Sequence, residues 1–117
     1  MSARRAEARP GAVRLRASAP VFAALGDETR LRLVARLGTE GPLSIARLTS
    51  GTEVTRQAVT KHLHVLAGAG LTRGTRHGRE RRWELEPEPL QEARRCLDLI
   101  SAQWDEALAR LKAAVEE

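Results

Sequence analysis

Apolar residues in this sequence recur every three or four positions, which is the period of an α-helix. The pattern predicts five helices, at about residues 20–25, 28–37, 44–50, 55–67 and 89–115. Asp27, Ser44 and Thr55 stand at the starts of three of them, where their side chains can accept a free backbone N–H of the first turn. The chain is therefore expected to be mainly helical.

A different pattern follows the fourth predicted helix. Residues 71–76 and 81–85 are short runs that contain Thr, Trp and alternating Arg, and the stretch 77–80 between them contains a glycine. Such a sequence predicts a β-hairpin. Two short helices joined by a Gly-containing turn outline a helix-turn-helix. The sequence thus predicts a mainly α (α+β) winged helix-turn-helix with about five helices and a two-stranded β-hairpin wing.

One folded domain is expected over residues 19–117, preceded by a basic arm at residues 1–18 that we expect to be mobile. The last helix, at about 89–116, repeats apolar residues over four heptads, which is more than a small body can cover. Its remaining face is therefore expected to pack against a second copy of the chain. The residues expected there are Leu90, Leu97, Ile100, Trp104, Leu108 and Leu111.

Positive charge is concentrated in one block of the chain. Residues 55–82 carry six Arg and one Lys against one Glu, a net charge of +6, whereas residues 83–117 carry −5 and the whole chain +5. A basic block on a folded segment predicts a polyanionic partner, and double-stranded DNA is the partner that suits a helix-turn-helix.

Two classes of protein are disfavoured by composition. No apolar run approaches the roughly 18 residues of a membrane span, so no membrane partner is expected. The single cysteine, Cys96, excludes an internal disulfide and a multi-cysteine metal site, and it fits a reducing cytoplasm. We expect its side chain to act as a small buried hydrophobe.

The outward face of the helix at 55–67 carries side chains that suit the major groove of DNA. Arg56 and Gln57 can form paired hydrogen bonds with base edges, whereas Lys61 can bind phosphate. Five arginines within ten residues of the hairpin exceed what a merely solvated surface needs. The predicted DNA contacts are Thr55, Arg56, Gln57, Thr60, Lys61 and His64 on the helix and Arg73, Arg76, Arg79, Arg81 and Arg82 on the wing.

Three segments resemble the ArsR-type winged-helix transcriptional regulators. FAALGDETRLRLV at 22–34, AVTKHLHVL at 58–66 and GRERRWEL at 78–85 are similar to the family's opening, recognition helix and second wing strand. The resemblance spans about residues 20–116. It implies a homodimeric, cytoplasmic, prokaryotic repressor that blocks its promoter. It also implies a dimer formed by the first and last helices, which adds Val21 and Phe22 to the expected interface.

The sequence departs from that family where metal-sensing members bind metal. Those members carry Cys-x-Cys in the third helix, where this chain has Ser44 and Ala46, or Asp and His in the last helix, which here has no His. We therefore expect no metal site and no cofactor. The turn at residues 51–54 is about two residues longer than the family's usual turn.

The chain contains no nucleophile motif, phosphate loop or metal-ligand spacing, so it is not expected to be an enzyme. Two alternatives to a plain repressor stay open. One is an effector- or metal-responsive sensor of the same fold, with an unknown small-molecule effector at an unrecognised site. The other is a dimerisation module that does not bind DNA.

Overall fold

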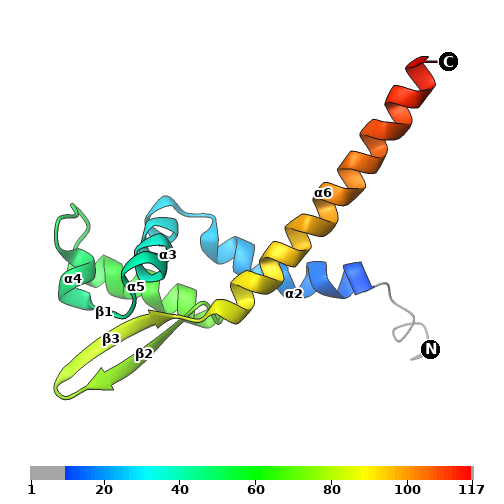
Figure 1. Ribbon diagram of the computed structural model, residues 1–117. Helices are drawn as coiled ribbons and strands as arrows, with labels where there is room; N and C mark the ends of the chain where they lie inside the picture. The colour runs from blue at the N-terminus through cyan, green and yellow to red at the C-terminus, as the bar shows by residue number, and fades with distance from the viewer. Residues whose placement is uncertain (1–9, 117) are drawn as a thin grey trace.

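A computed structural model describes the fold over residues 10–116. A body of short helices and a hairpin carries one long helix that projects away from it (Figure 1). In chain order the elements are α2 (Pro10–Leu25), α3 (Glu28–Glu40), β1 (Leu43–Ser44), α4 (Ile45–Thr49), α5 (Arg56–Gly68), β2 (Thr72–His77), β3 (Glu80–Leu85) and α6 (Pro87–Glu116). The predicted winged helix-turn-helix fold is confirmed.

Three helices begin where the sequence predicts a capping side chain. The Asp27 carboxylate accepts the Arg30 N–H at 3.0 Å and starts α3. The Ser44 hydroxyl does the same for α4, and the Thr55 hydroxyl accepts the Ala58 N–H at 3.1 Å at the start of α5. These bonds satisfy backbone donors that a helix start leaves free.

The first helix begins about ten residues earlier than predicted. Helix α2 starts at Pro10, so the segment 10–18, predicted as part of the arm, is helical; residues 1–9 lie outside the described residues. The sequence does not predict this helical segment because residues 10–18 carry few large apolar side chains. Helix α2 packs against α6, and Arg14 lies 4.0 Å from Glu92 of that helix. Helix α3 likewise continues through Gly38 and ends at Gly41, whose φ of 84° favours glycine.

The predicted hairpin is present and gains a third strand. Strands β2 and β3 pair antiparallel, and β1 adds to the other edge of β3, which gives the order β1-β3-β2. Trp83 in β3 stands opposite Leu43 on one side and Gly74 on the other. A two-residue strand has no periodic signal, so the sequence could not predict β1.

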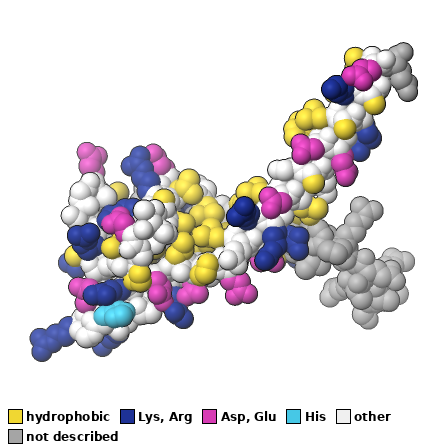
Figure 2. Space-filling view, viewed as in Figure 1, with side chains coloured by type: hydrophobic (Ala, Val, Ile, Leu, Met, Phe, Trp, Pro, Cys, Tyr) yellow, Lys and Arg dark blue, Asp and Glu magenta, His cyan; other side chains and the backbone are white. Residues whose placement is uncertain are grey.

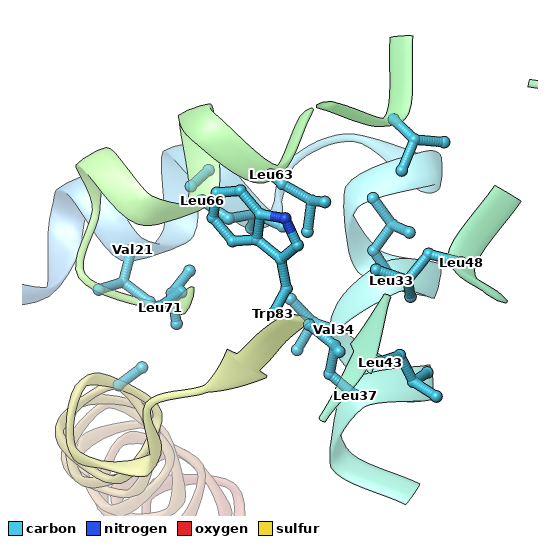
Figure 3. Close-up of a cluster of buried hydrophobic side chains, with 13 residues drawn as sticks. Val21, Leu33, Val34, Leu37, Leu43, Leu48, Leu63, Leu66, Leu71 and Trp83 are labelled. Atoms are coloured by element: carbon cyan, nitrogen blue, oxygen red, sulfur yellow. The ribbon is translucent and has the colours of Figure 1, made fainter. Parts of the chain in front are cut away.

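The core lies between the sheet, α3 and α5. Figure 3 shows the Trp83 indole pointing from β3 toward Leu63 and Leu66 of α5. The side chains of Leu48, Leu63, Leu66 and Leu71 have no exposed surface, and Trp83 is 2% exposed. Burial at this density fixes α5 against the wing, because a shift of either would open a cavity.

Helix α6 has two different halves. Ala93 and Cys96, in its first half, are buried, and this half packs against α2. The second half projects from the body, so its apolar side chains are exposed (Figure 1). With 30 residues the helix extends about 45 Å at 1.5 Å per residue. None of the helices within residues 10–116 combines the length and the hydropathy that a membrane span requires.

Candidate nucleic-acid interface

Helix α5 presents one buried face and one polar face. Val59, Leu63 and Leu66 are buried at the helical spacing of the apolar stripe. The opposite face carries the side chains predicted to contact DNA, of which Thr60 is half-buried and the others are exposed. These residues are Thr55, Arg56, Gln57, Thr60, Lys61 and His64.

The polar face of α5 is continuous with a hollow beside α4. Ile45, Arg56, Gln57, Thr60 and Lys61 line this hollow, which has a volume of about 490 Å³. The Thr60 hydroxyl donates to the Arg56 carbonyl at 2.9 Å, which leaves the hydroxyl oxygen free to accept. Four of the predicted helix contacts therefore lie together on one accessible surface.

Two of the wing arginines are engaged within the protein. Arg73 pairs with Glu84 across the hairpin and with Glu86 at 3.1 Å, and the hydrogen bond to Glu84 raises the pKa of Arg73. Arg82 pairs with Glu80 at 2.9 Å. These two side chains were predicted as DNA contacts, but their charges already have acidic partners.

The other wing arginines are differently placed. Arg76 and Arg79 have no acidic partner within 4.0 Å in the part of the chain that the structure describes, and they line a hollow of about 290 Å³ with Arg81. Figure 2 shows Lys and Arg side chains gathered at the wing end of the molecule. The free positive charge of the wing is therefore at its tip.

Arg81 is fixed by its contact with the core tryptophan. Its guanidinium lies over the Trp83 ring, 5.0 Å from the ring centroid, which is cation–π geometry. The strand opposite supplies Gly74, where an added Cβ would lie 2.7 Å from the Arg81 Nε atom. Glycine at this position thus leaves room for Arg81 to rest on the indole.

The same tryptophan contacts the recognition helix. The His64 ring meets the Trp83 ring edge to face, with centroids 5.4 Å apart. Trp83 therefore contacts one predicted DNA contact on α5 and one on the wing. The buried Thr72 hydroxyl of β2, which donates to the Leu63 carbonyl at 3.1 Å, is a second link between the helix and the wing.

A polar cluster joins α5 to the helices behind it. The Arg30 guanidinium donates to the Ala24 carbonyl at 2.6 Å and lies 3.3 Å from His62 Nδ1 on α5. His62 Nδ1 is also 3.9 Å from the Asp27 carboxylate. A hydrogen bond from the Arg30 backbone N–H lowers the pKa of Asp27. The cluster thus links α2, α3 and α5 at one point.

Sequence reasoning missed the role of Arg30 in this cluster. His62 lies 32 residues from Arg30 in the chain, and no sequence pattern connects the two. The one available signal is that Arg30 stands in the first turn of α3, directly after the Asp27 cap.

The predicted dimer surface is largely exposed in the single chain. Leu97, Ile100, Trp104, Leu108 and Leu111 are between 45% and 65% exposed. Leu90 and Phe22 are half-buried. Val21 is only 5% exposed and packs in the core of its own chain, which leaves little surface for a partner.

The described residues contain no cluster of three or more His, Cys, Asp or Glu side chains that could hold a metal ion. Ser44 has the structural role of capping α4, and the Cys96 side chain is buried.

Known proteins with similar sequences and structures are transcriptional regulators. Residues 25–75 match the family model described as a helix-turn-helix domain. The chain is 39% identical over 85 residues to the HTH-type transcriptional regulator Rv2034 of Mycobacterium tuberculosis, a match that covers 73% of this chain and 76% of the relative. It is 38% identical over 77 residues to the HTH-type regulator YuzN of Bacillus subtilis, which covers 61% and 84%.

A solved structure is similar over most of the fold. The ArsR-like transcriptional regulator from Rhodococcus sp. RHA1 superimposes with a TM-score of 0.72 at 39% sequence identity, and the match covers 84% of this chain and 92% of that one. The predicted family is therefore confirmed. With its winged helix-turn-helix fold and these relatives, the chain belongs to the ArsR family of DNA-binding transcriptional regulators.

Proposed function

We propose that this protein is a cytoplasmic homodimeric repressor that binds a pseudo-palindromic operator. Two copies of α5 enter successive major grooves, about 34 Å apart, and the two wings lie outside them. The observation that carries the proposal is the exposed polar face of α5 beside a wing whose tip is basic. A steep salt dependence of duplex binding is its first test.

Base reading is assigned to Arg56 and Gln57. Both side chains are exposed near the N-terminus of α5, and both can form two hydrogen bonds with one base edge. Lys61 and Thr55 are assigned to phosphates, because Lys61 is a point charge and Thr55 stands at the positive end of the helix.

The wing contributes charge through Arg76, Arg79 and Arg81. Arg73 stiffens the hairpin through its pair with Glu84 across the strands, and Arg82 pairs with Glu80 within β3. A phosphate would have to compete with a carboxylate at both positions. The proposal therefore narrows five candidate wing contacts to three.

Dimerisation is assigned to the exposed stripe of α6, with Phe22 and Leu90 at its edge. An apolar stripe of this length is unfavourable in water, and its burial contributes about 25 cal/mol per Å² of apolar area. The other copy of the same helix offers a matching stripe.

Duplex binding by the full chain should weaken steeply with salt. The slope of log K against log[salt] is expected to have a magnitude of about 5 to 10, since each neutralised phosphate contributes about 0.9. Arg79→Ala should reduce the slope and weaken binding to all sequences equally. Arg73→Ala should change both the slope and the affinity less. A flat salt dependence would contradict DNA binding.

Replacement of a base-reading side chain should relax sequence preference. Gln57→Ala is expected to lose about 1–3 kcal/mol of discrimination at particular base pairs and to keep its affinity for unrelated duplexes. Binding to a panel of single-base operator variants measures this. A uniform loss over all sequences would assign Gln57 to the DNA backbone instead.

The contact between His62 and Arg30 should set the orientation of α5. Asn places an oxygen near the position of Nδ1, so His62→Asn should keep operator affinity within about threefold, whereas His62→Gln should lose about tenfold. Non-specific affinity and the salt slope should stay unchanged in both.

This comparison separates positioning from helix stability. Gln favours helices more than Asn does, so an effect on helix stability alone would rank the two variants in the opposite order. Equal operator affinity of the two variants, at matched melting temperatures, would rule out the positioning role of His62.

Trp104→Asp should abolish dimerisation. Trp104 is 65% exposed in the single chain and is the largest side chain on the stripe, and central aromatic residues dominate interface energies. Sedimentation should find a folded monomer, and operator affinity should collapse because one recognition helix remains. Asp105→Ala, next to it, is the matched control. A variant Trp104→Asp that stays dimeric would refute the interface.

A further inference from the structure

The hollow beneath the turn that precedes α5 is a ligand site, and we propose that it binds a small zwitterion with an apolar body, the simplest being an α-amino acid with a hydrocarbon side chain. Its occupancy changes operator affinity. That regulatory consequence rests on the proposed function, whereas the binding itself does not.

The turn between α4 and α5 is built to stand away from α3. Gly51 takes a φ of 76°, which reverses the chain directly after α4. The Thr52 hydroxyl then donates to the Thr49 carbonyl at 2.7 Å, and the Thr52 N–H donates to the same carbonyl at 3.2 Å. These bonds hold the turn to the end of α4, so the space between the turn and α3 stays open.

The hollow has the size and lining of a small-molecule site. Its volume is about 340 Å³, and known ligand pockets begin at roughly 300 Å³. The buried Leu33, Leu48 and Val59 lie at its floor, and the half-buried Val54 supplies an accessible apolar wall from the turn. Such a lining suits a branched aliphatic or aromatic side chain.

The two sides of the hollow carry opposite charges. Arg32 lies on the α3 side of the hollow. Its only ion pair among the described residues is with Glu28, and both side chains of that pair are 78% exposed. Exposed pairs of this kind are weak, so Arg32 can turn to a ligand. Glu53 lies on the turn side and has no ion pair within residues 10–116.

The third charged residue of the lining is already engaged. Arg36 donates through Nε to Glu40 at 2.9 Å and through Nη1 to the carbonyls of Arg47 and Leu48. The hydrogen bond from Arg36 also lowers the pKa of Glu40. This arginine fixes α3 to the end of α4 and is not counted as a ligand contact.

One cation and one anion facing an apolar lining select a zwitterion. A ligand carboxylate pairs with Arg32, a ligand ammonium pairs with Glu53, and the hydrocarbon side chain covers Val54. A simple carboxylic acid would leave Glu53 unpaired beside its own negative charge. A simple amine would leave Arg32 unpaired beside its own positive charge.

The position of the hollow connects it to DNA reading. Val54 directly precedes Thr55, which caps α5, and Val59 lies on α5 itself. The base-reading candidates Arg56 and Gln57 lie between them in the chain. A ligand that contacts Val54 thus acts on the residue directly before the cap of the recognition helix, and any preference of the ligand for one orientation of α5 appears as a change in operator affinity.

Titration of the full chain with L-leucine and L-phenylalanine tests the binding. At least one should bind with a Kd below about 1 mM, and 4-methylpentanoate and 3-methylbutylamine, which lack one charge each, should bind about tenfold more weakly than L-leucine or not at all. No binding of either amino acid at 10 mM, or equal binding of the two analogues, would overturn the proposal.

Charge-neutral variants locate the site. Arg32→Gln and Glu53→Gln should each weaken amino-acid binding about tenfold, because each removes one charge-assisted pair. Arg95→Gln, another exposed arginine in a helical ion pair, and Glu106→Gln, another exposed glutamate, are the matched controls and should bind normally. Equal effects in the controls would place the binding elsewhere and overturn the assignment.

Operator binding is then measured with and without saturating amino acid. A change of at least threefold supports the regulatory role, and binding without any change overturns it. The amino-acid titration contains no DNA, so it tests ligand binding even if the protein fails to bind an operator. Loss of ligand binding alone would leave the proposed repressor intact.

Discussion

The burial of Trp83 between the sheet and α5 is the contact on which the DNA-binding surface depends. Trp83 lies on the central strand β3, and its indole points toward the buried leucines of α5, meets the edge of His64 and lies under Arg81. Together with the hydrogen bond from Thr72 to the Leu63 carbonyl, this side chain holds the recognition helix to the wing. Gly74 opposite it completes the arrangement, since a side chain there would displace Arg81.

Charge in this small domain is divided between structure and function. Arginines that face carboxylates stiffen the fold, as Arg73 and Arg36 do. The hydrogen bond from Arg36 lowers the pKa of Glu40, and the hydrogen bond to Glu84 raises the pKa of Arg73. Arginines without such partners, Arg76 and Arg79, gather at the wing tip. The net charge of residues 55–82 predicts a polyanionic partner. The ion pairs within the protein determine which arginines keep a free charge to bind that partner.

Local chemistry explains why much of this could be predicted. The caps at Asp27 and Thr55 and the stripe of α5 depend on neighbours in the chain, so the helices and the outward face of α5 follow from spacing alone. Contacts between distant segments left no such signal. The pairing of Arg30 with His62, the two-residue strand β1 and the burial of Val21 against other elements all arise from packing across the fold. The helical segment 10–18 has no such signal either, because it contains few large apolar side chains.

Selection of bound duplexes from a random pool by the full-length protein tests the central claim most directly. Two copies of α5 in successive major grooves should enrich an inverted repeat whose half-sites are centred about one helical turn, or 34 Å, apart. Enrichment of a single asymmetric site, or of no sequence at all, would contradict the account of a dimer that reads DNA through α5.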